Sequence, residues 1–514
     1  MILYIPREAV TDTSAVLYWD KVPGADVYRI YRDGELVAER KETDGLLEGL
    51  KPAERHLFQV KAFAPDGSCM VWSPEVPMTT EAPEQVISAA NAGLIPDRKD
   101  PETVRHNTQL LQKAIDGCPA GGTVRVDAGQ YVCGALFLHG EMTLRLEEGA
   151  VLKASDDPAD FPPFEYRYEG ILQKNFACLI NTRPGVQNRN LRITGSGTIH
   201  ANGKVLFRKE LDSPEANRSN AVCIQNTEGL YLEGITIREA PFWCLHPIFC
   251  SHVTMYGIHV ITGRDENGAD YGQFNGDGID PDSCSYVAIL NSEIESQDDC
   301  IAVKAGRYDE GRRVGIPSEH IRISNCQFFR GFGAAMGSES SAGIRDVLVQ
   351  DCIFTDSFSI GAVKNRRGKS GYIEDIVYDA CTLVNRNPKY RESKWFRGAI
   401  YIDQTYGTDH PDLVHPVPVD DNTPYIGRIT FRNIRVSTPY GKPIYIYGLP
   451  ERHIDGITLE NIDAEGKDGC IIINADHVRM SNVSVRLIGE ERERQMRTAP
   501  GASSIFGTAD TLPA

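Results

Sequence analysis

The amino-acid sequence predicts an all-β protein: a right-handed parallel β-helix preceded by a small β-sandwich. Three observations lead to the β-helix. Strand-like runs follow one another from about residue 120 onward, with almost no further helical pattern. The runs share the form apolar-x-apolar-x-(Asn/Asp/Gly)-x-x-apolar, and most neighbours are 21 to 34 residues apart. One coil of this size cannot bury its apolar face alone, so such repeats stack into a solenoid.

The repeats extend through most of the chain. The recurring runs are Leu230–Ile237, Val253–Val260, Val287–Ile294, Ile321–Phe328, Val347–Phe354, Ile429–Val436 and Ile457–Ala464. The 82 residues between Asp351 and Asn433 are expected to hold further coils and an insertion. Stacked strands lie about 4.8 Å apart, so equivalent residues lie above one another. Cys326, Cys352 and Cys381 occupy equivalent points of three repeats. They are therefore expected to form an interior ladder and not a metal site.

Residues 1–80 are expected to form the separate β-sandwich. Short alternating runs, separated by Pro-Gly and Asp-Gly turn signals, occupy Ala15–Trp19, Val27–Tyr31 and Leu57–Phe63. Their layout, with Leu50-Lys51-Pro52 ahead of the last run, resembles a fibronectin type III module. Residues 81–90 are expected to be a linker, and residues 91–514 the β-helix. A helical pattern over Pro101–Gly117 is expected to cap the N-terminal end of the stack, where bare strand edges invite aggregation.

The composition excludes several classes of protein. Of 514 residues, 41% are hydrophobic and 24% charged, which argues against wholesale disorder. The net charge of -17 argues against a nucleic-acid partner. No apolar stretch reaches the length of a transmembrane helix, so no membrane partner is expected. The first residues lack the pattern of a secretory signal. The 13 cysteines are expected to be reduced. The missing signal pattern and the reduced cysteines together favour a cytoplasmic protein; the alternative is a secreted protein whose signal was removed.

The polar residues that carry chemistry are concentrated between residues 275 and 369. Four motifs follow one another at intervals of about one coil: Asn275–Asp280, Gln297–Cys300, Gly331–Glu339 and Val363–Lys369. Coil stacking brings such motifs to one lateral position. The sequence therefore predicts a cleft that runs along the stack.

Three aspartates in this cleft suit glycoside hydrolysis. One carboxylic acid protonates the leaving oxygen, and a second carboxylate activates water or attacks directly. Crowded carboxylates repel, so one of Asp277, Asp298 and Asp299 keeps a raised pKa. Adjacent residues on a strand face opposite ways, so Asp298 and Asp299 must lie at a strand end or bend. Two other interpretations of these aspartates remain at this point: they are turn residues without a catalytic role, or they bind Ca²⁺.

The motifs resemble those of glycoside hydrolase family 28, the polygalacturonases, over nearly all of residues 85–485. Asn275-Gly276-Asp277 matches the Asn-Thr-Asp motif of that family, and Asp298-Asp299 matches its Asp-Asp motif. The resemblance implies that Asp298 is the general acid. It also implies that Asp277 and Asp299 activate water, that Asn275 contacts substrate and that the anomeric configuration inverts. No cofactor and no metal are implied.

Two positions depart from the pattern of the family. Phe332 stands where the family has the histidine of Gly-His-Gly, and Ala362 stands where it has the arginine of Arg-Ile-Lys, while Lys364 keeps the lysine. Rhamnogalacturonan hydrolases of the family lack the same two residues. In contrast, the runs Gly337-Ser338-Glu339 and Arg366-Arg367-Gly368 resemble bacterial exo-polygalacturonases, a group in which a fibronectin-like module also occurs.

The candidate substrate-binding residues follow from these motifs and from charge. An acidic protein that binds an acidic sugar needs local cations, and arginine can bind a carboxylate in bidentate fashion. The insertion 385–425 is rich in aromatic residues, which could close one end of the cleft and impose exo action, or form a satellite core. The candidates are Lys364, Asn275, Arg366, Arg367, Glu339, Phe332, Trp395 and Tyr401. Lys369 is expected to add charge; Arg307, Arg312 and Arg313 are further rim candidates.

The sequence therefore predicts an exo-acting hydrolase that releases galacturonic acid from pectic oligosaccharides. Short imported fragments are what a cytoplasmic enzyme would meet. Three alternatives stay open: a rhamnogalacturonan or substituted-galacturonan hydrolase, a β-helix lyase with a lysine or arginine base, and a carbohydrate-binding β-helix without activity. The oligomeric state and the role of the first module are not determined by the sequence.

Overall fold

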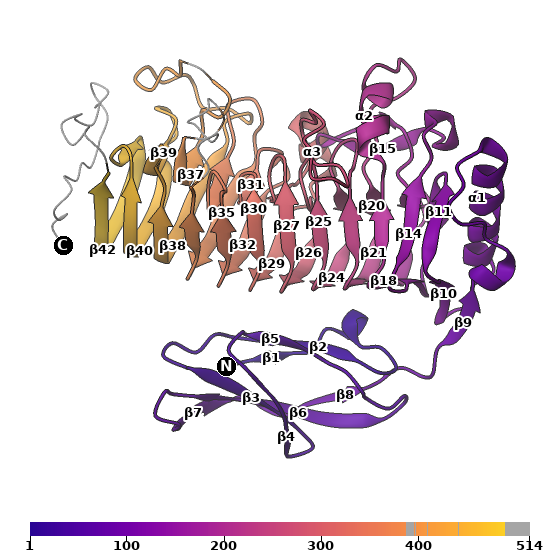
Figure 1. Ribbon diagram of the computed structural model, residues 1–514. Helices are drawn as coiled ribbons and strands as arrows, with labels where there is room; N and C mark the ends of the chain where they lie inside the picture. Colours follow the sequence, from indigo (N-terminus) through magenta and orange to yellow (C-terminus); the bar gives the residue numbers. More distant parts are fainter. Residues whose placement is uncertain (387–394, 396, 409, 440, 489–514) are drawn as a thin grey trace.

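The computed structural model describes residues 1–514 apart from 387–394, 396, 409, 440 and 489–514. The chain forms a right-handed parallel β-helix with a β-sandwich lying along one of its faces (Figure 1). Both predicted parts of the fold are therefore confirmed. None of the described helices is long and apolar enough to cross a membrane.

The N-terminal module consists of two antiparallel sheets. Trp19, Ile30 and Phe58 are fully buried between them. The three runs predicted from the sequence are strands β2, β3 and β6. One sheet contains β1 (Leu3–Tyr4), β2 (Ala15–Trp19) and β5 (Asp44–Leu47). The other contains β3 (Val27–Arg32), β4 (Glu35–Arg40), β6 (Arg55–Phe63), β7 (Cys69–Trp72) and β8 (Val76–Thr79). The closer likeness to a fibronectin type III module stays a prediction.

The β-helix has three parallel sheets, here numbered I to III. Sheet I faces the module. It consists of β9 (Gln85–Ser88), β10 (Gly122–Val126), β13 (Met142–Leu146), β18 (Asn188–Gly195), β21 (Thr227–Glu233), β24 (Ser251–Tyr256), β26 (Ser285–Leu290), β29 (Ser318–Ser324), β32 (Ile344–Gln350), β35 (Tyr372–Asp379), β38 (Tyr425–Ser437), β40 (Ile454–Gly466) and β42 (Ala475–Leu487). The first strand, β9, lies within residues 81–90, which the sequence suggested as a linker. It pairs in parallel with β10, so the β-helix begins inside that segment.

Sheets II and III complete each coil. Sheet II consists of β11 (Gly129–Cys133), β14 (Ala150–Ala154), β19 (Thr198–His200), β22 (Thr236–Arg238), β25 (His259–Ile261), β27 (Glu293–Ser296), β30 (Gln327–Arg330), β33 (Ile353–Thr355) and β36 (Thr382–Val384). Sheet III consists of β12 (Leu136–Leu138), β17 (Ile180–Thr182), β20 (Val222–Gln225), β23 (Leu245–Ile248), β28 (Ile301–Val303), β31 (Ala334–Gly337), β34 (Gly361–Lys364), β37 (Gly398–Asp403), β39 (Lys442–Tyr447) and β41 (Ile471–Ile473). Ile279 bridges β23 and β28, so sheet III is continuous.

The recurrent amide or acidic residue of each repeat has a backbone reason. Asn291, Asn325, Asp351, Asn433 and Asn461 all adopt a left-handed conformation, with φ between 47° and 57°. Asn and Asp tolerate this region better than other side chains. The amides also bond between coils, since Asn461 donates to Asn433 over 3.1 Å. Each turn therefore supports the next.

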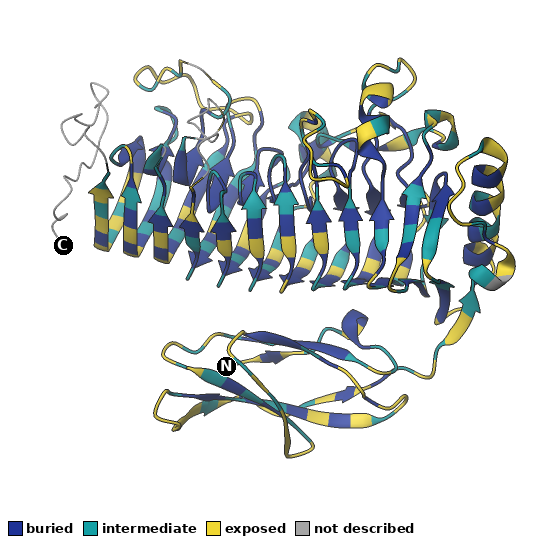
Figure 2. Cartoon of the chain, in the orientation of Figure 1, coloured by how far each residue is buried: buried dark blue, intermediate teal, exposed yellow. Residues whose placement is uncertain are grey.

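The interior of the stack is a continuous apolar core, which Figure 2 shows as buried residues along its length. Cys326, Cys352 and Cys381 are buried within it as free thiols, each with its sulfur near a carbonyl of a neighbouring coil. The interior ladder predicted for them is confirmed. Helix α1 (Pro101–Asp116) caps the N-terminal end with Leu111, Ala114 and Ile115 buried, and Asp100 accepts a hydrogen bond from the Thr103 amide at its start.

Insertions rise above sheet III, on the side away from the module (Figure 1). They are the hairpin of β15 (Phe164–Tyr168) and β16 (Ile171–Asn175), helix α2 (Gly203–Leu211) and helix α3 (Tyr308–Val314). Three short 3-10 helices, η1 (Arg7–Ala9), η2 (Ala90–Ala92) and η3 (Pro158–Asp160), lie elsewhere in the chain.

The module is bonded to sheet I through several contacts. Arg192 donates to the carbonyls of Glu8 and Val10, and Arg322 donates to the carbonyl of Trp19. The buried Glu8 carboxylate accepts a hydrogen bond from Thr254 over 2.7 Å. These contacts fix the module on the face opposite the insertions.

Candidate active site

The three predicted aspartates lie in turns that enter sheet III. Asp277 precedes Ile279, and Asp298 and Asp299 precede strand β28 one coil later. The Gly278 amide bonds the Asp299 carbonyl over 2.9 Å, which ties the two turns together. Asp298 and Asp299 lie at a bend between β27 and β28, and not on a regular strand. One carboxylate oxygen from each aspartate lies within 4.8 Å of those of the other two.

Two glycines allow the turns to approach this closely. A Cβ at Gly278 would lie 2.4 Å from the carbonyl oxygen of Cys300. A Cβ at Gly331, whose φ is 49°, would lie 2.2 Å from the carbonyl oxygen of Asp298. Neither position can hold a side chain without moving the backbone that carries the aspartates. The glycines of the Asn275–Asp280 and Gly331–Glu339 motifs thus have a structural reason beside the catalytic residues.

The aspartates line a pocket of about 220 Å³. Its walls come from five coils and from two insertions. The lining residues are Glu169, Trp243, Asn275, Asp277, Asp298, Asp299, Lys304, Arg307, Ser338, Glu339, Lys364, Arg366, Lys369, Trp395 and Tyr406. The cleft predicted from the four motifs therefore exists, and its local charge is mixed although the whole chain is acidic.

Two buried lysines contact two of the three aspartates. Nζ of Lys364 lies 2.5 Å from Oδ2 of Asp299, and Nζ of Lys304 lies 3.4 Å from Oδ2 of Asp277. Within the described part of the chain, no ion pair joins Asp298 to a cation. Oδ1 of Asp298 accepts the backbone amide of Asp299 over 3.0 Å. Asp298 therefore differs from Asp277 and Asp299, each of which faces the ammonium group of a lysine.

Burial and crowding raise the pKa of Asp277, Asp280 and Asp298. Burial, followed by the charge of Asp299, raises the pKa of Asp298 to about 6. Burial and the neighbouring Asp280 raise the pKa of Asp277 well above its usual value, against the opposing effect of Lys304. Burial raises the pKa of Asp280 to about 8. The cluster therefore retains at least one proton near neutral pH, which acid catalysis requires.

A second ionic group forms the other wall of the pocket. Glu339 is buried between Lys304 and Lys369, at 3.3 and 3.0 Å. Burial opposes its ionisation, but Lys369 and Lys304 hold the pKa of Glu339 well below its usual value. Arg307 and Arg366 lie beside this group, and Arg307 pairs with Glu169 over 2.8 Å. The wall presents cationic groups that suit a carboxylate ligand.

The structure brings most of the predicted site residues together. Asn275, Glu339, Lys364, Arg366 and Trp395 all line the pocket with the three aspartates. Asn275 adopts φ of 54° and accepts a hydrogen bond from Arg218 over 2.9 Å, which orients its amide.

Three predicted substrate-binding residues lie elsewhere. Tyr401 is fully buried in β37 and donates to Asp403 over 2.6 Å, because its strand directs it into an aromatic column with Tyr445. Phe332 stacks on Phe358 and is not among the pocket-lining residues. Arg367 points away from the pocket and pairs with Glu451.

Sequence reasoning missed Glu169, Trp243 and Lys304. Lys304 directly follows strand β28, which comes after Asp298-Asp299, so its short distance from that motif in the sequence could have marked it as a site residue. Glu169 comes from an insertion more than 100 residues earlier, and nothing in the sequence marks it. Of the rim candidates, Arg307 lines the pocket, whereas Arg312 contacts Asp309 and Asn422 outside it.

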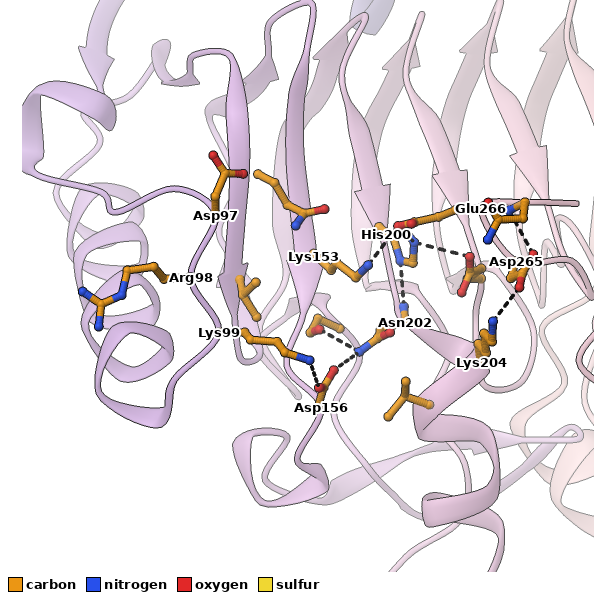
Figure 3. A pocket seen from close by; sticks show the side chains of 16 residues that line it. Asp97, Arg98, Lys99, Lys153, Asp156, His200, Asn202, Lys204, Asp265 and Glu266 are labelled. Carbon is orange, nitrogen blue, oxygen red and sulfur yellow. Dashed lines mark hydrogen bonds and ion pairs between the residues drawn. The ribbon is translucent and has the colours of Figure 1, made fainter.

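A larger cavity, of about 460 Å³, lies near the N-terminal end of the stack (Figure 3). Its charged side chains are paired with one another: Lys153 with Glu266, Lys204 with Asp265 and Lys99 with Asp156. It lacks both the crowded carboxylates and the aromatic side chains of the smaller pocket. Size alone therefore does not identify the site.

A metal ion fits the smaller pocket poorly. The oxygens of Asp277, Asp298 and Asp299 are close enough to one another to bind a divalent cation. However, ammonium groups already contact Asp277 and Asp299. The donor set therefore suits proton transfer better than metal binding.

A parallel β-helix whose cleft holds three crowded carboxyls, two of them with a raised pKa, defines a glycoside hydrolase. The chain belongs to the glycosyl hydrolases family 28, whose family model matches residues 179–485.

The chain is similar to known members of this family. A "Probable polygalacturonase" of Vitis vinifera is 27% identical over 370 residues, which cover 69% of this chain and 70% of that protein. An "Exo-poly-alpha-D-galacturonosidase" of Dickeya chrysanthemi is 26% identical over 466 residues, which cover 74% of each.

Solved structures share the fold. The family 28 exopolygalacturonase of Yersinia enterocolitica superimposes with a TM-score of 0.77 at 22% identity, over 95% of this chain and 96% of that one. That coverage leaves fewer residues than the module contains, so the likeness extends into the module. An exopolygalacturonase from Thermotoga maritima superimposes with a TM-score of 0.63 at 22% identity, over 78% of this chain and 92% of that one.

Proposed function

We propose that this hydrolase is exo-acting and releases galacturonic acid from the ends of galacturonides, with inversion of configuration. The observation that carries the proposal is the pocket itself. It places three carboxyls against a wall of buried cations in a small, walled space. The relatives named exo-polygalacturonases support the same substrate class.

In this mechanism, Asp298 is the acid. Its raised pKa keeps a proton available, which Asp298 donates to the glycosidic oxygen as the bond to the anomeric carbon breaks. Asp277 and Asp299 accept a proton from a water molecule on the opposite face of the ring. The oxygen of that water forms the new bond to the anomeric carbon, so the configuration inverts.

The cationic wall recognises the uronic acid. Arg307, Arg366 and Lys369 all line the pocket, so that a carboxylate bound there meets a cationic wall. Arginine binds carboxylates in a planar, bidentate geometry that a neutral sugar does not offer. Trp243 and Trp395 supply flat apolar surfaces beside them, which pack against sugar rings.

Exo action follows from the hairpin that closes the pocket. At its tip, the Gly170 carbonyl accepts the backbone amide of Arg307 over 3.0 Å, and Glu169 pairs with the Arg307 side chain. Close to this tip, the buried pair of Arg167 and Asp282, 2.6 Å apart, holds the hairpin in place. A chain that enters the pocket therefore meets a wall, which limits cleavage to a chain end.

Product analysis tests this function. Oligogalacturonides incubated with the protein should yield galacturonic acid alone at early times. A ladder of oligomers would show endo action, and an ultraviolet-absorbing unsaturated product would show a lyase. No product from any pectic substrate would favour a binding protein. Loss of release in Asp298→Asn separates catalysis by this site from a contaminating activity.

A second candidate is a hydrolase of rhamnogalacturonan or substituted galacturonan. Ala362, which replaces an arginine of the family, is fully buried in register with Ala335 and Tyr401. The floor of the cleft is thus apolar beyond the aspartates, which suits a less charged sugar unit. Release from rhamnogalacturonan fragments in preference to oligogalacturonides would establish this alternative.

A further inference from the structure

Lys304 is one of the two most enclosed cations of the pocket, with Lys364. It follows strand β28 and bridges to Asp282 of the previous coil, and its side chain is 3% exposed. Its ammonium lies between three carboxyls, 3.4 Å from Asp277, 3.5 Å from Asp280 and 3.3 Å from Glu339. Lys304 therefore joins the catalytic aspartates to the opposite wall.

Lys304 is held in one position and stays charged. The ring of Trp243 lies 4.2 Å from its ammonium, so the lysine is confined by the aromatic face. Burial works against the charged form, but Glu339, Asp277 and Asp280 together raise the pKa of Lys304 well above its usual value. A lysine in such surroundings is a fixed positive charge across the working pH range.

The carboxyls around Lys304 do not depend on it equally. Glu339 also pairs with Lys369, over 3.0 Å. Asp277, by contrast, forms its one ion pair with Lys304 within the described residues. Its other close charged neighbours are Asp280, Asp298 and Asp299, all of which oppose its ionisation. Removal of Lys304 would therefore take away the cation that Asp277 contacts and leave the carboxyls that oppose its ionisation.

We propose that Lys304 is a positioning residue that holds the Asp277 carboxyl toward the water and opposes its protonation, so that Asp277 can act as a base beside Asp298. Lys364 contacts Asp299 in the same way, over 2.5 Å. Each of the two assigned bases thus contacts a lysine, whereas no described ion pair joins a cation to Asp298, and this contrast divides the three carboxyls into one acid and two bases. This division rests on the proposed hydrolysis, because only that reaction gives the acid and the bases different tasks.

The test compares Lys304→Met with Lys304→Arg and Lys369→Met. Methionine keeps the length of the side chain and removes the charge. A cation within about 4 to 6 Å lowers the pKa of a carboxylate by about one to three units. The acidic limb of the pH profile of kcat/KM, which reports the base, should therefore move to higher pH by about one unit or more in Lys304→Met. Lys304→Arg should return the limb toward its original position.

Lys369→Met is the matched control. Lys369 is also buried and also contacts Glu339, but no described ion pair joins it to a catalytic aspartate. Its loss should raise KM for a uronide and leave the acidic limb in place. An unmoved limb in a folded Lys304→Met protein, or an equal shift in Lys369→Met, would overturn the proposal.

A measurement without substrate keeps this inference separate from the proposed reaction. Potentiometric titration of the folded proteins should show that Lys304→Met holds carboxyl protons to a higher pH than the wild-type protein, because Asp277 loses the cation that lowers its pKa. Equal proton uptake would refute the role of Lys304 whatever the substrate. If the two proteins differ in proton uptake as expected but the wild-type protein releases no galacturonic acid, the proposed function alone is refuted.

Discussion

Nζ of Lys364 lies 2.5 Å from Oδ2 of Asp299, although the two residues are 65 positions apart in the chain. Both side chains are buried at the bottom of the pocket. Burial opposes the charge of the lysine, but Asp299 together with Tyr406 and Asp298 raises its pKa. Lys364 therefore contacts one of the three candidate catalytic aspartates directly.

Replacement of Asp298 by Asn should abolish most of the activity. The amide cannot donate an acidic proton, and general acid catalysis contributes about 10²- to 10⁴-fold to a rate. We expect kcat on oligogalacturonides to fall by about that factor with little change in KM. Reducing-sugar release under steady-state conditions measures the change. Asp463→Asn, at an exposed position of β40, is the control and should retain full activity. Comparable rates in the two variants would contradict the assignment of the acid.

Activity should fall as the pH rises through about 6. The acid must be protonated to act, and burial with the charge of Asp299 raises the pKa of Asp298 to about 6. Because this pKa lies above the usual value, Asp298 is largely protonated at pH 5 and largely ionised at pH 7.5. The alkaline limb of kcat/KM should therefore lie near pH 6. A profile that stays flat from pH 5 to pH 8 would exclude Asp298 as the titrating acid.

A bulky residue at the tip of the hairpin should disturb substrate binding. A Cβ at Gly170 would lie 2.9 Å from Cβ of Arg307 and 3.0 Å from Cγ of Glu339. Overpacking of this kind costs about 1 to 3 kcal/mol, and 1.4 kcal/mol corresponds to a factor of ten in binding. Gly170→Val should raise KM about ten- to hundredfold as Arg307 is displaced.

Gly185→Val is a matched control for the backbone. Gly185 has φ of 71°, close to the 77° of Gly170, but no atom lies within 4 Å of the position of its Cβ. Its substitution strains the turn without crowding the pocket. If KM rises equally in both variants, the effect comes from backbone strain and not from the contact between the hairpin and Arg307.

The module should loosen from the β-helix when its bonds to arginine are removed. Arg192 and Arg322 donate hydrogen bonds to backbone carbonyls of the module. Hydrogen bonds from charged donors contribute about 1.5 to 3 kcal/mol each. The double variant Arg192→Met/Arg322→Met should unfold at a lower temperature and be cleaved faster by protease between residues 80 and 84. Its kcat should be unchanged, because neither arginine lines the pocket.

Arg345→Met provides the comparison. This exposed arginine lies on β32 and pairs with Glu319 of the neighbouring coil, without contact to the module. A surface ion pair of this kind contributes at most about 1 kcal/mol. Cleavage rates that match those of the double variant would show that the arginine contacts do not hold the module.

The coil repeat and the three aspartates could be predicted from the sequence. Apolar residues recur because each coil must bury the same inward positions, and Asn or Asp recurs at Asn433 and Asn461 because the turn needs a left-handed residue. A repeat of this kind gives the position of each residue within its coil. The repeat therefore predicted that Asp277 and Asp298, which are one coil apart, lie in the same cleft.

The tertiary structure decided which other side chains reach the cleft. Tyr401 and Tyr406 belong to the same aromatic insertion, yet Tyr401 lies inside the aromatic column and Tyr406 lines the pocket. Strand direction in β37 sets this difference, and composition does not reveal it. The hairpin that carries Glu169 reaches the pocket from a coil far away in the sequence.

By itself, the sequence determined the right-handed β-helix and the three candidate catalytic carboxylates. Only the tertiary structure decided how these carboxylates divide the work, because ionisation depends on neighbours brought close by folding. Lys304 and Lys364 contact Asp277 and Asp299, and no described cation pairs with Asp298. A charge a few ångströms away shifts a pKa by whole units, and such distances are set by the packing of coils and insertions.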